Sequence, residues 1–195
     1  MDAFELLVEA HRPAMKPVLA KLVRLLEEHK VRYVIGGATA LSLYIRPRMT
    51  VDVDAFVDPV QKADVDKLLT AEFELVTIGV FHSKFKDADV EIDILYAGAG
   101  AEDFALSSAG DAVILGTKLK AASPEALLWL YLVSDSEQHF VDALNLLRSN
   151  AGLDIGLVRR QLERKQPDVL AKLEKMLHRA EQPAPSYEES RARRS

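Results

Sequence analysis

The chain of 195 residues contains no cysteine, which excludes disulfide bonds and thiolate metal sites. It also has no run of about 18 apolar residues, the length that a membrane-spanning helix needs. Its first residues, Met-Asp-Ala-Phe-Glu, lack the basic and apolar segments of a signal peptide. We therefore expect a cytoplasmic protein with no membrane partner. The histidines have no metal-ligand spacing, so we expect surface or hydrogen-bonded roles for them.

An excess of positive charge is absent too, because the formal net charge is −5. This argues against a protein dominated by nonspecific binding to nucleic acid, although a local basic groove stays open. The apolar fraction of 49% is ample for a core. The length predicts one domain, or one domain with a small helical appendix.

Helical and strand patterns alternate along the first two thirds of the chain, and helical patterns dominate the rest. The expected helices are 2–11, 15–29, 38–44, 60–70, 101–109, 123–133, 135–149, 154–165 and one that opens at Pro167. The expected strands are 33–35, 50–58, 73–77 with 79–85 (two strands or one bent strand), 90–96, 112–115 and 117–119. The composition from residue 182 onward predicts a disordered tail.

Two glycines, Gly36 and Gly37, end the short apolar strand Tyr33–Ile35 and precede a predicted helix. Glycine permits a tight turn and a close backbone approach to a ligand. The first turn of the helix offers unpaired N–H groups, which favour phosphate. A strand-to-helix turn without any ligand is the simpler interpretation of a Gly-Gly pair taken alone.

Three aspartates occupy alternating positions on two predicted strands. Asp52 and Asp54 share one face of strand 50–58, because successive same-face residues lie about 6.6–6.8 Å apart along a strand. Asp93 follows in strand 90–96, and a hairpin at Asp87–Asp89 places it in the same sheet. Aspartate is depleted in strands, so two aspartates in alternation suggest a functional role, and a strand with one solvated face stays open as the alternative. The carboxylates are suited to bind Mg²⁺ or Mn²⁺.

The strand before this hairpin carries His82 and Lys84 at alternating positions. For these two side chains, a solvated sheet edge is the simpler interpretation.

Together these segments resemble the signature of the nucleotidyltransferase superfamily related to DNA polymerase beta, and in particular its minimal and AbiEii-like abortive-infection toxin branches. The resemblance covers roughly residues 15–165. The segments that carry it are Gly36-Gly37, Arg48-Met49-Thr50-Val51-Asp52-Val53-Asp54, the later Val-Glu-Ile-Asp strand, Ser123-Pro124-Glu125, and Asp142 before Leu146-Leu147.

The resemblance implies an α/β (α+β) fold: a small mixed sheet flanked by helices in residues 1–121, a C-terminal helical part in residues 122–181, and a tail in residues 182–195. It also implies transfer of a nucleoside monophosphate from a nucleoside triphosphate to a hydroxyl acceptor. RNA, tRNA in particular, is the acceptor associated with toxin members, which have a cognate antitoxin as partner. Other members of the family are associated with protein or small-molecule acceptors.

By position in the motif, the resemblance assigns each candidate residue a role. It implies that Asp52, Asp54 and Asp93 bind the metal ions and that Asp93 helps the acceptor hydroxyl lose its proton. It also implies that Gly36 and Gly37 face the triphosphate. Arg48 and Thr50 support the loop or the phosphates.

The sequence departs from the family in its first C-terminal helices. The family carries a lysine, an arginine and a Lys-Asp pair there, whereas this chain has apolar residues at 127–132 and Ser-Asp-Ser-Glu-Gln-His at 134–139. Another cation, such as Lys84, Lys118 or Lys120, would have to replace them. The alternative is a catalytically degenerate member that binds a nucleotide or a partner.

Overall fold

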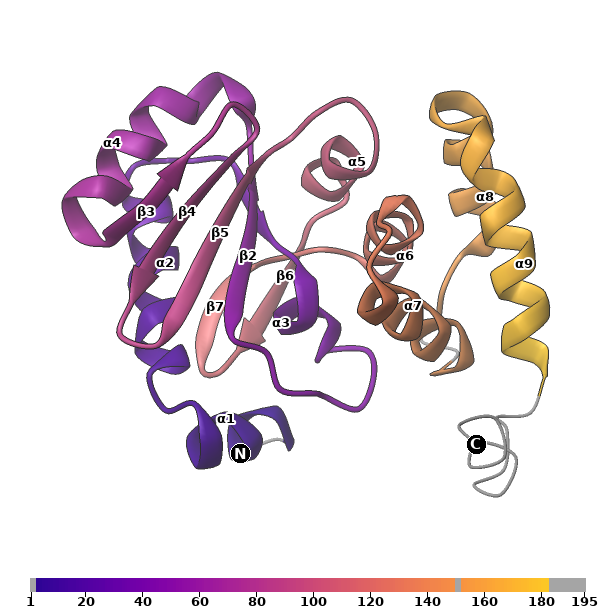
Figure 1. The fold of residues 1–195 in the computed structure, drawn as a ribbon, viewed down its shortest axis with the longest axis horizontal. Coiled ribbons are helices and arrows are strands. Elements are labelled where there is room, and N and C mark those ends of the chain that lie inside the picture. Colours follow the sequence, from indigo (N-terminus) through magenta and orange to yellow (C-terminus); the bar gives the residue numbers. More distant parts are fainter. Residues whose placement is uncertain (1–2, 150–151, 183–195) are drawn as a thin grey trace, which may run out of the picture.

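The computed structural model describes residues 3–149 and 152–182. Within these residues, seven strands form one sheet in the order β3-β4-β5-β2-β1-β7-β6 (Figure 1). The pairs β2–β5 and β1–β7 are parallel and the others are antiparallel, so the sheet is mixed, as expected. The strands are β1 Tyr33–Ile35, β2 Asp52–Val57, β3 Glu74–Ile78, β4 His82–Asp87, β5 Val90–Tyr96, β6 Gly110–Ile114 and β7 Thr117–Ala121.

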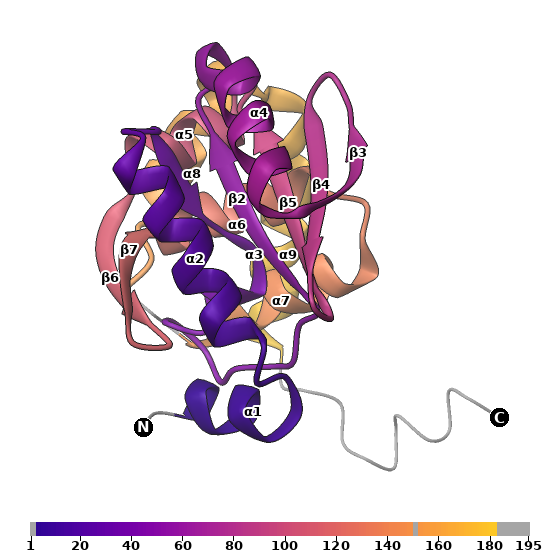
Figure 2. The same ribbon diagram turned by 90° about the vertical axis from the view of Figure 1, so that its left-hand side faces the viewer.

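The helices lie on both faces of the sheet, with α2 and α4 on one face and α3, α5, α6 and α7 on the other (Figures 1 and 2). Their bounds are α1 Ala3–His11, α2 Met15–Glu28, α3 Gly37–Leu41, α4 Lys62–Glu72, α5 Ala101–Ser107, α6 Pro124–Val133, α7 Glu137–Ser149, α8 Ile155–Lys165 and α9 Leu170–Glu181. This arrangement confirms the α/β class and the flanking helices. Among the described residues, no helix has the length and apolar character that crossing a membrane requires.

The two faces of β2 and β5 differ because side chains alternate along a strand. Val53, Ala55, Ile92 and Ile94 are fully buried. Tyr96 shares their face of β5 and donates a hydrogen bond to Asp66 of α4, so this face packs under the helices. The aspartates lie on the opposite face.

The C-terminal helices pack around α6, which is apolar on every side. Its Trp129 is fully buried and donates a hydrogen bond of 2.6 Å to Gln166, and Tyr131 and Leu132 are also buried. The start of α6 follows the sequence signal, because Ser123 accepts a hydrogen bond from the backbone N–H of Ala126. One hydrophobic cluster runs through the sheet and these helices, and the division of the chain at residues 121 and 122 stays a prediction.

Several expected helices have wrong boundaries. The helix predicted at 101–109 ends at Ser107, the one predicted at 135–149 begins at Glu137, and the one predicted to open at Pro167 begins at Leu170 after a 3-10 turn. The helix predicted at 38–44 ends at Leu41, because the next residues make i→i+3 turns and the Ser42 hydroxyl bonds back to the Thr39 carbonyl. The helix predicted at 60–70 begins at Lys62, after a 3-10 turn that Asp58 caps. Segments 73–77 and 79–85 are two strands, and the predicted disorder of the tail falls, from residue 183 on, outside the described residues.

Candidate functional site

The three predicted aspartates meet on the sheet face opposite α2 and α4. Asp54 on β2 lies directly opposite Asp93 on the parallel strand β5, and Asp52 lies one same-face step before Asp54. One carboxylate oxygen from each of the three lies within 4.8 Å of the others. Among residues 3–149 and 152–182, this is the one group of three acidic or histidine side chains with such spacing.

The electrostatics of this triad favour a bound cation. Burial, together with the negative charges of Asp52 and Asp93, raises the pKa of Asp54 to about 7. Oxygen-only donors that repel one another are the donor set that Mg²⁺ or Mn²⁺ accepts. The residues present therefore fit a divalent metal.

The Gly-Gly turn touches the triad. Gly37 has a φ of +54°, a left-handed conformation, and a Cβ atom at this position would overlap Oδ2 of Asp54. A Cβ atom on Gly36 would overlap the ring of Phe56, and the Gly36 N–H donates a hydrogen bond of 2.9 Å to the Asp54 carbonyl. Only glycine permits this approach, so the turn is built around the carboxylate of Asp54.

Arg48 and Thr50 serve the loop before β2. The Thr50 hydroxyl donates a hydrogen bond to Oδ1 of Asp52. The Arg48 guanidinium pairs with Asp142 of α7, with 2.8 Å from Nη2 to Oδ2. Burial alone would lower the pKa of Arg48, but the hydrogen bonds and charge of Asp142 outweigh burial and raise it. Both residues therefore support the loop, and the structure brings the Arg48 charge beside the triad.

The site also includes β4, contrary to the interpretation of His82 and Lys84 as a solvated edge. β4 lies between β3 and β5, so it is an inner strand. Nε2 of His82 lies 2.6 Å from Oδ1 of Asp93, and Nζ of Lys84 lies 3.4 Å from the same oxygen. His82 and Lys84 lie on the same face of β4. Once β5 is known to be the neighbouring strand, this alternation places both side chains on the face that holds Asp93.

The other two lysines considered as replacement cations lie elsewhere. Lys118 and Lys120 are on β7, which β1 separates from β2. Lys120 pairs with Asp111 of β6 at 2.7 Å. Of the three lysines, Lys84 is the one at the carboxylates.

Helix α6 also supports the Gly-Gly turn. This contact was not predicted from the sequence, because Trp129–Leu132 lies in an apolar run. The Tyr131 hydroxyl donates a hydrogen bond of 3.2 Å to the Gly37 carbonyl. Burial, with the charges of Asp142 and Asp54, raises the pKa of Tyr131, which keeps the phenol protonated. The Tyr131 ring also packs on His139, whose centroid is 5.0 Å away and whose Nδ1 lies 2.7 Å from the Ser134 hydroxyl. Burial lowers the pKa of His139.

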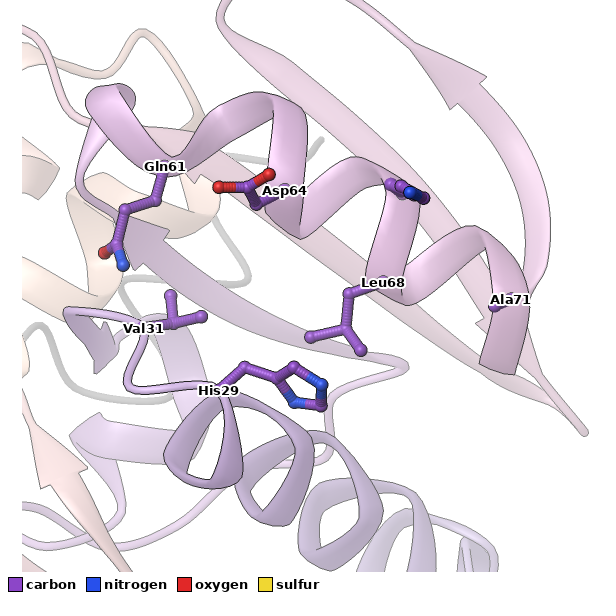
Figure 3. A pocket seen from close by; sticks show the side chains of 7 residues that line it. His29, Val31, Gln61, Asp64, Leu68 and Ala71 are labelled. Atoms are coloured by element: carbon purple, nitrogen blue, oxygen red, sulfur yellow. The ribbon is translucent and has the colours of Figure 1, made fainter.

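A cavity of about 240 Å³ adjoins Asp54 between the sheet and α6. It is lined by Gly37, Asp54, Phe56, Leu95, Glu102, Leu130, Tyr131, Val133, Ser134 and His139. A larger cavity of about 520 Å³ lies between α2 and α4 (Figure 3). Its lining includes His29, Asp64 and Leu68. No aspartate of the triad lines it, so it is not part of the carboxylate site.

No model of a known protein family and no curated protein matches the sequence. Solved structures do match. The solution structure of the antibiotic-resistance factor ANT(2'')-Ia superposes with a TM-score of 0.61 at 17% identity, over 86% of this chain and 98% of that chain. Its crystal structure with adenylyl-2''-tobramycin gives a TM-score of 0.59 at 16% identity, over 77% and 98%. At these identities the likeness shows that this chain shares the fold of ANT(2'')-Ia, and it shows the fold alone. The AbiEii-like branch stays a prediction.

Proposed function

We propose that this protein is a metal-dependent nucleotidyltransferase that moves a nucleoside monophosphate from a nucleoside triphosphate to a hydroxyl acceptor. The observation that carries the proposal is the convergence of Asp52, Asp54 and Asp93 beside the Gly36-Gly37 turn. Three carboxylates held within 4.8 Å of one another repel, and a bound divalent cation would offset this repulsion.

Each residue then has a role in the reaction. Asp52 and Asp54 hold the divalent metal, and Asp93 completes the site and accepts the proton of the acceptor hydroxyl. The hydroxyl oxygen forms a bond to the α-phosphorus as the bond to pyrophosphate breaks. A divalent cation supplies charge neutralisation for the triphosphate and the leaving pyrophosphate when it is bound. The backbone at Gly36 and Gly37 leaves room for the phosphates.

The acceptor is the finer part of the proposal. RNA, and tRNA in particular, follows from the resemblance to toxin members, together with a cognate antitoxin. The likeness to ANT(2'')-Ia, whose structure contains adenylyl-2''-tobramycin, supports a small hydroxyl acceptor instead. The cavity of about 240 Å³ beside Asp54 suits a small group better than a duplex.

A second candidate is a degenerate member that binds nucleotide or a partner without turnover. The observation that favours it is the lack of basic residues at 127–132 and 134–139, where the family has them. Arg48 and Lys84 are the cations that would have to compensate, and both already pair with carboxylates.

One experiment separates the two candidates. The protein is incubated with each α-labelled nucleoside triphosphate, Mg²⁺ or Mn²⁺, and either total RNA or tobramycin. The control is the Asp52→Asn, Asp54→Asn double variant. Label on an acceptor that disappears with the double variant supports the transferase and names its base and acceptor class. Bound nucleotide without label supports the degenerate module.

A further inference from the structure

The buried carboxylate of Asp142, on α7, reaches a loop that precedes it by 94 residues. Its Oδ1 and Oδ2 each lie 3.1 Å from Nε of Arg48, and Oδ2 lies 2.8 Å from Nη2. Gln138, one turn earlier on α7, donates a further hydrogen bond of 2.9 Å to Oδ1. The Asp142 side chain is only 2% exposed, whereas that of Arg48 is 34% exposed. A carboxylate this buried requires a charged partner, so the pair is a fixed feature of the fold.

Arg48 faces the carboxylate triad without bonding to it. Among the described residues, its side chain hydrogen-bonds to Asp142 and to the Met49 carbonyl, the latter at 3.1 Å from Nη1. The loop nevertheless ties Arg48 to the triad, because Thr50, two residues further on, donates its hydroxyl to Asp52. An arginine without Asp142 would be free to pair with Asp52 or Asp54 directly. Asp142 therefore holds the Arg48 guanidinium close to the triad and prevents it from pairing with the triad carboxylates.

The same contact sets the course of the loop into β2. The hydrogen bonds of Arg48 to Asp142 and to the Met49 carbonyl fix the backbone just before Thr50. Thr50 in turn donates its hydroxyl to Asp52. An unbroken series of contacts thus links α7 to the first carboxylate of the triad.

We propose that Asp142 is a positioning residue for the nucleotide site: it orients Arg48 toward the triphosphate and orders the loop from which Thr50 holds Asp52. The part of this proposal that concerns nucleotide rests on the proposed function, whereas the ordering of the loop rests on the contacts alone. Held in this way, Arg48 supplies a cation at the site, in a chain that lacks the family's basic residues on α6 and α7.

The test is a double-mutant cycle of Asp142→Asn, Arg48→Gln and the two combined. The matched control is Glu174→Gln. It removes the carboxylate from a second arginine–carboxylate pair, Arg159–Glu174, in which two hydrogen bonds join α8 to α9. Two quantities are measured. The first is amide hydrogen exchange of residues 49–52, and the second is the affinity for a nonhydrolysable nucleoside triphosphate analogue with Mg²⁺.

We expect each single variant to speed exchange at residues 49–52 and to weaken nucleotide binding by about 10–100-fold, the usual loss when a supporting residue is removed. The combined variant should be no worse than Arg48→Gln alone, because residues that act as one unit are not additive. Glu174→Gln should change neither quantity. If Asp142→Asn does not fold, Arg48→Lys replaces it, since lysine keeps the charge and loses the two-bond geometry.

Effects that multiply in the combined variant, or an Asp142→Asn variant that matches Glu174→Gln, would overturn the inference. A wild-type protein that binds no nucleotide would overturn the proposed function instead. In that case unchanged exchange at residues 49–52 in Asp142→Asn would also reject the ordering role of Asp142, and faster exchange would uphold it.

Discussion

The two faces of strands β2 and β5 have different roles: one contributes to the hydrophobic core and the other carries the candidate site. On the face toward α2 and α4, Val53 and Ile94 are fully buried and make up part of the hydrophobic core. On the other face, one residue away in sequence, Asp54 and Asp93 lie opposite each other in the site, and burial with the neighbouring negative charges raises the pKa of Asp54. The same alternation therefore gives a substitution on one face an effect on folding and a substitution on the other an effect on function.

The largest expected effect comes from Asp54→Asn. We expect turnover to fall by about 10³-fold or more, because the central carboxylate of the metal site is lost. Stability at pH 8 should not fall, since the neutral amide removes a buried, repelled charge. Turnover and urea denaturation measure the two quantities.

Ile94→Ala is the matched variant on the opposite face. It should cost about 2–5 kcal/mol of unfolding free energy, because it leaves a cavity in the core. Turnover per folded molecule should stay close to that of the wild type. If Asp54→Asn is the variant that destabilises and Ile94→Ala the one that loses turnover, the division between the faces is wrong.

Gly37→Ala should have the next largest effect. A methyl group at this left-handed position would displace the Asp54 carboxylate, and a misplacement of about 1 Å can cost about 100-fold in turnover. Turnover and circular dichroism are measured together. Gly98→Ala is the control, because a Cβ atom there meets nothing within 4 Å. Equal turnover of the two variants would show that the close approach of Gly37 to Asp54 is not needed.

The pH dependence of stability should carry the signature of Asp54. Its pKa rises from 3.8 to about 7 on folding, so between these values the native state binds more protons than the unfolded state. This contribution therefore lowers the unfolding free energy as pH rises from about 4 to about 7. Relative to Asp54→Asn, the wild type should lose roughly 1–3 kcal/mol between pH 5 and pH 8, at about 1.4 kcal/mol for each pKa unit.

Urea denaturation of both proteins at the two pH values, without divalent metal, measures this difference. Titrating groups that do not interact with Asp54 are common to the two proteins and cancel. Adding Mn²⁺ at pH 8 should reverse the loss in the wild type alone, because a ligand that binds the native state stabilises it. Parallel pH curves for the two proteins would mean that Asp54 titrates normally.

The local parts of the fold were predictable from the sequence. Alternation identified β2 and β5 and the face that holds Asp52, Asp54 and Asp93, and Ser123 with Pro124 marked the start of α6. These features depend on residues a few positions apart. The strand order was not predictable in the same way, because the parallel pairing of β1 with β7 joins distant segments and leaves no local pattern.

The supporting contacts of the site have the same limitation. Arg48 and Asp142 are 94 residues apart, and the motifs that contain them do not show that the two side chains pair. His82 and Lys84 read as a solvated edge because their pattern does not say whether β4 has a neighbour on both sides. Tyr131 lies within an apolar run, so its hydroxyl bond to Gly37 has no sequence signal.

The smallest expected effect is that of His82→Gln. The same oxygen of Asp93 faces both Nε2 of His82 at 2.6 Å and Nζ of Lys84 at 3.4 Å, so one partner remains after the substitution. The His82 side chain is 43% exposed, and water can replace its hydrogen bond. We expect turnover to fall about 2–5-fold, close to the loss of one modest hydrogen bond, with nucleotide affinity unchanged.

His29→Gln is the control for this variant, because His29 lines the cavity between α2 and α4, on the sheet face opposite the triad. It should leave turnover unchanged. A loss for His82→Gln as large as that for Asp54→Asn would mean that His82 does more than orient Asp93. The chemical face of the sheet would then extend from β2 and β5 across β4, and the acceptor hydroxyl would have a second candidate for its proton.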